Sequence, residues 1–196
     1  MKHLKLFESF SDVESICKKY GIKNYTINSD GSVDVDGNVS LYKMELTKIP
    51  LKFNRVTGGF YCSNNELTSL EGAPKEVGGD FYCSNNKLIS LEGCPREVGV
   101  NFNCFYNELT NLIGSPKEVG GNFTCSHNQL TSLEGGPKKV GGDFYCSDNP
   151  LPKEILDNDD YIKYIINNQD DYSIWKADGI LDLYRFHDMM EDKNNE

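Results

Sequence analysis

Val77-Gly-Gly-Asp-Phe-Tyr-Cys-Ser-Asn-Asn-Lys-Leu88 is a phrase that returns along the chain with a period of 21 residues. Edited copies begin at Val56, Val98, Val119 and Val140. A fixed period of about 20–30 residues is typical of solenoids, in which one repeat cannot bury its apolar face alone. The period therefore predicts stacked coils around one continuous core.

Aligned copies separate constant columns from variable ones. The constant columns of the copy that starts at Val77 are Val77, Phe81, Cys83, Asn86, Leu88, Leu91, Gly93 and Pro95. An earlier, degenerate copy runs through Val35, Val39, Leu41, Met44, Leu46 and Ile49. We therefore expect six strand positions, with the last coil ending near Leu151.

The constant columns have a packing explanation. Phe81 and Cys83 are two residues apart, so on a strand both point to the same side, which we expect to be the interior. A buried Asn86 amide must hydrogen-bond to backbone groups, and a column of such residues would do so in every coil. The Gly-Gly pairs suit tight corners with positive φ, and the prolines suit the returning side of each coil.

The motif L-x-L-x-x-N-x-L maps onto Phe81, Cys83, Asn86 and Leu88 and onto the same columns of the other copies. This pattern resembles the leucine-rich repeat family, and the Leu-x-x-Leu before a proline is closest to its short bacterial subtype. The resemblance covers residues 35–152. It implies an α/β solenoid with a parallel β-sheet on the concave face, and a source in a tailed bacteriophage.

The two ends of the chain lack the 21-residue repeat and show helix and hairpin patterns instead, which predicts end caps. Residues 1–34 are expected to form a helix plus a hairpin, because Ser11-Asp-Val-Glu14 is a capping box and two strand-like runs flank Ser29-Asp30-Gly31. Residues 35–152 hold the repeats, and residues 153–196 are expected to form a helical cap. One C-terminal helix is expected near residues 159–166 and a second over 179–192.

The second C-terminal helix is expected to bury one face. Its members are Ile180, Leu181, Leu183, Tyr184, Phe186 and Met190. Trp175, the only tryptophan, is expected to pack between these helices and the last coil, with partner contact as the alternative.

Composition excludes several classes of protein. The chain has 196 residues and a net charge of −10, and it contains no run of 18 apolar residues that could span a membrane. The N-terminus has no apolar stretch of signal-peptide length. We therefore expect a cytoplasmic protein, in the host cytoplasm if it is phage-encoded, with no membrane partner.

The seven cysteines are expected to be packing residues rather than reactive or metal-binding residues. Five of them recur at 21-residue spacing, with no C-x-x-C pair, and the inward column explains them as small buried apolar groups; disulfide and metal ladders are the alternatives. His3, His127 and His187 have no partner motif. We therefore expect no catalytic residue, no metal, no cofactor and no enzymatic activity.

The variable columns of each strand should face solvent, and they carry the predicted partner-binding residues. These are Tyr61, Tyr82, Asn101, Asn103, Phe105, Tyr106, Thr124, His127 and Tyr145. In one coil Phe105 and Tyr106 replace the usual Ser-Asn, which indicates a binding hot spot or drift in a tolerant repeat. No basic stripe is present, so nucleic acid is not expected, and the acidic columns favour a partner with basic or hydrogen-bonding groups.

The sequence thus predicts a non-enzymatic scaffold that binds a protein partner through the concave repeat face. If the chain comes from a phage, the target would be a host or defence protein. The alternative is a structural or assembly-associated virion protein, for which Leu4-Lys5-Leu6-Phe7-Glu8 would be a docking or cleavable segment. The sequence does not indicate the oligomeric state.

Overall fold

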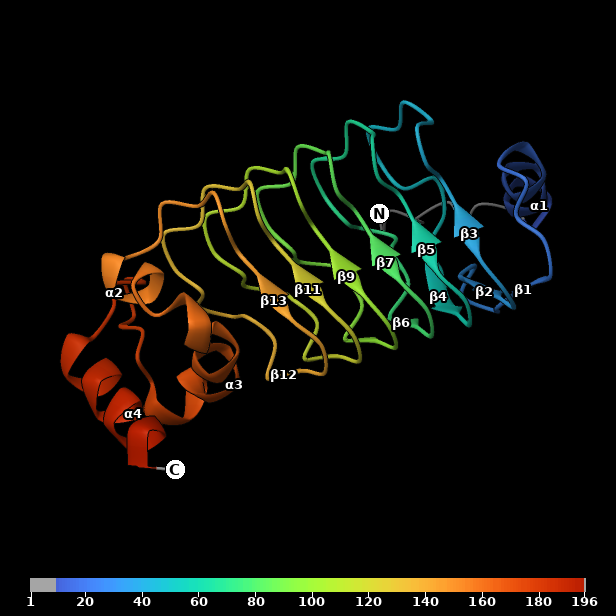
Figure 1. Cartoon of the computed structure of the whole chain (residues 1–196). Coiled ribbons are helices and arrows are strands. Elements are labelled where there is room, and N and C mark those ends of the chain that lie inside the picture. The colour runs from blue at the N-terminus through green and yellow to red at the C-terminus, as the bar shows by residue number, and fades with distance from the viewer. Residues whose placement is uncertain (1–9, 196) are drawn as a thin grey trace, which may run out of the picture.

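The computed structural model describes residues 10–195. The chain winds into a solenoid of about five turns, with parallel β-sheets along two of its sides and helices at its ends (Figure 1). Each regular coil contributes one short strand to each sheet, and we refer to the sheets as sheet A and sheet B.

Sheet B is built from the Phe columns that the sequence marked as strands. Within residues 10–195 it has six strands, all parallel: β3 (Val39–Ser40), β5 (Phe60–Tyr61), β7 (Phe81–Tyr82), β9 (Phe102–Asn103), β11 (Phe123–Thr124) and β13 (Phe144–Tyr145). Each Phe is in register with the Phe one coil away, for example Phe81 with Phe102. The six expected strand positions are therefore confirmed.

Beyond its N-terminal hairpin, sheet A was not predicted. Its strands within residues 10–195 are β1 (Tyr25–Ile27), β2 (Val33–Val35), β4 (Phe53–Val56), β6 (Glu76–Val77), β8 (Glu97–Val98), β10 (Glu118–Val119) and β12 (Lys139–Val140), and only β1 is antiparallel to its neighbour. This side was expected to consist of turns because of its prolines. A two-residue strand is too short to show the alternation of apolar and polar residues that marks a strand. The only sequence signal of these strands was the Val that recurs every 21 residues.

The core runs the length of the solenoid as stacked columns. Phe60, Phe81, Phe102 and Phe123 are fully buried, and neighbouring rings in this column lie 4.9–5.6 Å apart between centroids. Cys62, Cys83, Cys104 and Cys125 are also fully buried, and the Val column lies behind sheet A. The predicted inward direction of the Phe and Cys columns is therefore confirmed.

The Asn column joins each coil to the one before it. The Asn107 Oδ1 accepts a hydrogen bond from the Leu88 N–H at 3.0 Å, and its Nδ2 donates to the carbonyls of Cys83 and Cys104 at 3.2 and 3.0 Å. Asn86, Asn128 and Asn149 repeat this pattern. The buried amides thus satisfy turn backbone that would otherwise be unpaired, as predicted.

The Gly-Gly pairs serve a different purpose from the one predicted. Positive φ occurs at the glycine two residues before each repeat proline (Pro74, Pro95, Pro116 and Pro137), such as Gly93 at 88°, and not at Gly78, Gly99, Gly120 or Gly141. A Cβ on Gly99 would lie 2.1 Å from the Gly78 carbonyl oxygen, and the other coils repeat this contact. These glycines are required because successive backbones stack too closely for any side chain.

The N-terminal elements agree with the sequence analysis. Helix α1 (Phe10–Lys19) lies at the start of the solenoid, close to the predicted helix that begins near Ser11 (Figure 1). The hairpin of β1 and β2 follows it and pairs Tyr25 with Val35.

The C-terminal elements are α2 (Lys153–Leu156), the 3₁₀ helix η1 (Asp159–Tyr161), α3 (Ile162–Tyr172) and α4 (Leu183–Asn195). The prediction that the last helix begins near Gly179 was wrong, because a turn closed by the Trp175–Leu181 bridge occupies that stretch, with Gly179 at a φ of 76°. In consequence Ile180, Leu183 and Tyr184 are exposed rather than buried, and Met189 is buried beside Phe186 and Met190.

Trp175 is partly buried, and its Nε1 donates to the Gln169 Oε1 at 2.6 Å, which fixes the turn against α3. Among residues 10–195, no helix is long and apolar enough to cross a membrane.

Candidate functional site

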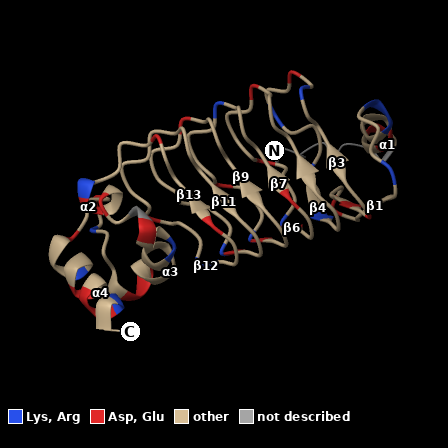
Figure 2. Ribbon diagram, in the orientation of Figure 1, with Lys and Arg blue, Asp and Glu red and all other residues tan. Residues whose placement is uncertain are grey.

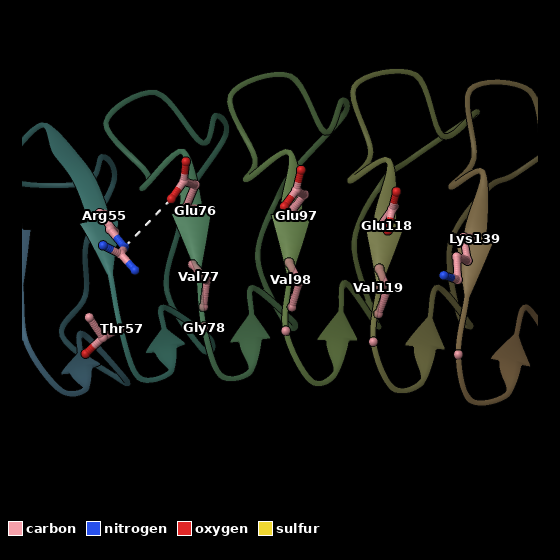
Figure 3. Close-up of a pocket in the computed structure, with 13 residues that line it drawn as sticks. Arg55, Thr57, Glu76, Val77, Gly78, Glu97, Val98, Glu118, Val119 and Lys139 are labelled. Atoms are coloured by element: carbon pink, nitrogen blue, oxygen red, sulfur yellow. Dashed lines mark ion pairs between the residues drawn. The ribbon is translucent and has the colours of Figure 1, made fainter.

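The solenoid presents two sheet faces to solvent, and they differ in chemistry. The outer face of sheet A is a shallow groove of about 530 Å³ with a row of charged side chains along it: Arg55, Glu76, Glu97, Glu118 and Lys139 (Figure 3). The stacked glycines form its floor together with the edges of Val77, Val98 and Val119. This groove was not anticipated from the sequence, because sheet A itself was missed.

The charges of the sheet A row compensate each other only at its ends. Strand register places Glu76 beside Arg55, at 3.7 Å between Oε2 and Nε, and Glu118 beside Lys139. Glu97 lies between Glu76 and Glu118, and so has a like charge on both sides. Such a row keeps the face solvated but offers no aromatic side chain to a partner.

The outer face of sheet B, which we call the sheet B face, carries the residues that the sequence predicted for partner binding. It consists of positions 59, 61, 63 and 64 and their equivalents in the four following coils. No strand residue of sheet B is charged between residues 39 and 145 (Figure 2). The structure leaves Tyr106, His127 and Tyr145 exposed, and it leaves five others half-buried: Tyr61, Tyr82, Asn103, Phe105 and Thr124.

Three of the predicted residues meet in one group, which we call the aromatic cluster: Phe105, Tyr106 and His127. The Phe105 ring lies 4.9 Å from the His127 ring, edge-on, and 5.7 Å from the Tyr106 ring. Tyr106 and His127 are 5.8 Å apart. The His127 Nε2 also lies 3.2 Å from a carboxylate oxygen of Asp148. The cluster therefore combines apolar area with a charged rim.

Tyr106 occupies a backbone position that does not favour it. Its φ is 57°, in the left-handed region, and the equivalent residues Asn64, Asn85 and Asp148 have nearly the same φ. Asn and Asp tolerate this region because their short polar side chains bond locally, whereas a bulky residue there is an outlier. Tyr106 nevertheless stands there with 59% of its surface exposed.

The remaining predicted tyrosines form two separate groups. The Tyr61 and Tyr82 rings are 5.5 Å apart, and partial burial and the Asp80 carboxylate raise the pKa of Tyr61. At the far end of the face the Tyr145 hydroxyl donates to the Asp143 Oδ2 at 3.0 Å, and this bond raises the pKa of Tyr145. The two aspartates were not among the predicted binding residues, although their column was expected to be acidic.

The predicted asparagines have internal roles. The Asn101 Oδ1 accepts from the Asn122 N–H at 2.9 Å, and its Nδ2 donates to the Asp80 Oδ1 at 2.9 Å. The Asn103 Oδ1 accepts from the Phe105 N–H at 2.9 Å. These bonds hold the edge of the face in register, so Asn101 and Asn103 support the surface more than they are free to bind.

The cysteines contribute packing. Burial raises the pKa of Cys62 to about 12, and the thiols of Cys83 and Cys125 have pKa values well above normal for the same reason. Each of these last two thiols donates weakly to a carbonyl of the next coil, at 3.5 and 3.4 Å. None of the seven cysteines, all of which lie within residues 10–195, forms a disulfide, and the same residues contain no group of three His, Cys, Asp or Glu side chains arranged for a metal ion.

Leu4–Glu8, on which the virion alternative depended, and His3 lie outside the described residues. Comparison with known proteins finds no matching family model, no matching curated protein and no matching solved structure. A function for this chain must therefore be inferred from the residues on the outer face of sheet A and on the sheet B face.

Proposed function

We propose that this chain is a leucine-rich-repeat scaffold without enzymatic activity, which binds a protein partner through the sheet B face. The sheet B face would correspond to the concave face of that family. What supports the family assignment is the internal pattern, in which Phe, Cys, Asn and Leu columns recur at fixed spacing with the asparagine bonded to turn backbone. The same resemblance is the basis for proposing a phage source, with a host or defence protein as the partner.

The observation that carries the binding proposal is the aromatic cluster of the divergent coil (residues 98–118). The other coils place Ser at the position of Phe105 and Asn64, Asn85, His127 or Asp148 at the position of Tyr106, and Asn and Asp suit the left-handed corner better. In the divergent coil, Phe105 and Tyr106 replace residues that favour this backbone turn, and their aromatic rings are at least partly exposed to solvent. Strained, exposed aromatic residues concentrate at functional sites, and Tyr is among the residues enriched in binding hot spots.

The remainder of the face is consistent with recognition. Tyr61, Tyr82 and Tyr145 add contact area and lose little rotamer entropy on binding. Two-residue strands from successive coils hold these side chains on one rigid surface, about 4.8 Å apart per coil. A preorganised surface of this kind lowers the entropic cost of association.

The test uses the neighbouring coils as a guide to substitution. Phe105→Ser with Tyr106→Asn installs the residues that stand at 84 and 85, so the framework should be unaffected. Ile113→Glu is the matched control, because it removes an exposed apolar side chain of the same coil and Glu stands at the equivalent positions 71, 92 and 134.

We expect quantitative mass spectrometry of proteins captured from cell lysate to show at least one partner that wild type and the control retain equally. The Phe105→Ser, Tyr106→Asn variant should lose at least tenfold of that partner. Equal recovery with all three proteins would show that the divergent coil is drift and would overturn the proposal.

A further inference from the structure

The sheet B face carries negative charge without matching positive charge. Within residues 59–148 its outward columns contain Asp80, Asp143 and Asp148, and none of them contains Lys or Arg. Lys87, at the rim of the face, is paired with Glu66. The sheet A row, in contrast, includes Arg55 and Lys139. Lys43 stands in the column of Asn64 in the coil before this face, so the excess of carboxylates is a property of residues 59–148.

Two of these carboxylates stand beside tyrosines at opposite ends of the face. Asp80 neighbours Tyr61 across β5 and β7, and Asp143 accepts the hydrogen bond of Tyr145 on β13. Three to four strand spacings separate the two pairs, which is about 14–19 Å. Each pair offers a ring face and a carboxylate together, the combination that holds a guanidinium or ammonium group.

The surface between the pairs is neutral. Asn101, Asn103, Asn122 and Thr124 occupy the intervening outward positions, and the asparagines are engaged in bonds of the framework. The aromatic cluster borders this stretch on the side where the strands of β9 and β11 end. Along the solenoid axis, the face therefore offers a cation site at the Tyr–Asp pair of β5 and β7, an apolar contact at the aromatic cluster, and a second cation site at the Tyr–Asp pair of β13.

We propose that the partner presents an extended segment with two Arg or Lys side chains and an apolar side chain between them, laid along the solenoid axis. This inference rests on the proposed function, because it names the chemistry of the same site. In an extended chain, residues i and i+4 point to the same side and lie about 13 Å apart, and residues i and i+6 about 20 Å apart. These spacings bracket the separation of the two Tyr–Asp pairs.

The test begins with a displayed library of random dodecapeptides, selected on the immobilised chain in low salt. Enriched peptides are then measured by fluorescence anisotropy against three variants. The first is Asp80→Asn with Asp143→Asn, which keeps the framework because Asn stands in the same column at 38, 101 and 122 and accepts the same bonds. The second is Glu97→Gln with Glu118→Gln, which removes the same charge from sheet A. The third is Phe105→Ser with Tyr106→Asn.

We expect the enriched peptides to carry Arg or Lys four to six residues apart around an apolar residue. Their affinity should fall at least tenfold with the Asp80→Asn, Asp143→Asn variant and change less than twofold with the sheet A variant. Replacing both basic residues of the peptide by Glu should abolish binding.

Each other outcome is decisive. Equal losses with the two charge variants would show a general effect of net charge and would overturn the inference, as would a library that yields no binder. Peptides without basic residues that lose affinity only with the Phe105→Ser, Tyr106→Asn variant would overturn the inference and leave the proposed function intact. Peptides indifferent to all three variants would contradict both.

Discussion

Sheets A and B are formed by the same coils, yet their outer faces obey different rules. Sheet A presents Arg, Glu and Lys in register over a floor of glycines, and its inner layer is a column of Val. Sheet B presents tyrosines, amides and the aromatic cluster, and its inner layer is a stack of Phe with the thiols beside it.

The difference shows which variation in a repeat is informative. On sheet A the outward residue changes between Arg, Glu and Lys, all of which keep a surface wet. On sheet B one coil replaces small polar residues by rings at a corner that disfavours Tyr106. Variation that costs local stability is a better indicator of binding than variation that costs nothing.

The largest test compares the inner layers of the two sheets within one coil. Phe102→Ala removes a fully buried ring stacked between Phe81 and Phe123, and should lower the free energy of unfolding by about 3–5 kcal/mol. Val98→Ala removes less volume and should cost about 2 kcal/mol. Urea denaturation measures both, and an equal cost would mean that the two inner layers pack alike.

The glycine floor of sheet A provides the second test. Gly99→Ala places a methyl group 2.1 Å from the Gly78 carbonyl oxygen, so the coils must separate. We expect a loss of about 3 kcal/mol in the free energy of unfolding, since overpacking strains the backbone. Val100→Ala, one residue away at a position that tolerates a side chain, is the control and should cost less than about 1 kcal/mol. A harmless Gly99→Ala would contradict the close stacking.

A third test separates stability from binding on sheet B. Tyr106→Asn gives the left-handed corner the residue found there at 64 and 85, so the free energy of unfolding should rise by about 0.5–1 kcal/mol. Partner capture should fall in the same variant. Thermal and urea melts measure the first effect, and a fall in stability would show that the Tyr106 ring supports the fold rather than the site.

The smallest effect concerns the charge row of sheet A. Glu97→Lys replaces the two like-charge contacts with Glu76 and Glu118 by opposite-charge contacts, and should raise the free energy of unfolding by about 0.5 kcal/mol. The gain should shrink in 1 M salt, because these side chains are exposed. A gain that is independent of salt would point to packing instead of charge.

Much of the fold could be predicted because the repeat imposes one geometry on every coil. The constant Phe, Cys, Asn and Leu columns predicted which side of each strand is buried. Because successive side chains on a strand point to opposite sides, Tyr61 and Tyr82 were predicted to face solvent. The helix near Ser11 and the hairpin that follows it were predicted from a capping box and from turn residues. The last helix was predicted, but its start and part of its buried face were wrong, because Ile180, Leu183 and Tyr184 have helical spacing yet are exposed.

The candidate site was predicted as a set of columns and not as contacts. Which side chains meet depends on the rotation and spacing between coils, and these are properties of the stack. That Phe105 reaches His127 one coil away, or that Asn101 is bound to Asp80, could not be read from either repeat alone.

The chain's own sequence determined the period, the inward columns and the outward candidates, because these follow from residue spacing within one coil. Only the tertiary structure decided that a second sheet exists, that the paired glycines serve close stacking, and that Phe105 meets His127 and Asp80 meets Asn101 across neighbouring coils. The physical reason is that each of these depends on the 4.8 Å approach of neighbouring coils, a distance that no single repeat contains.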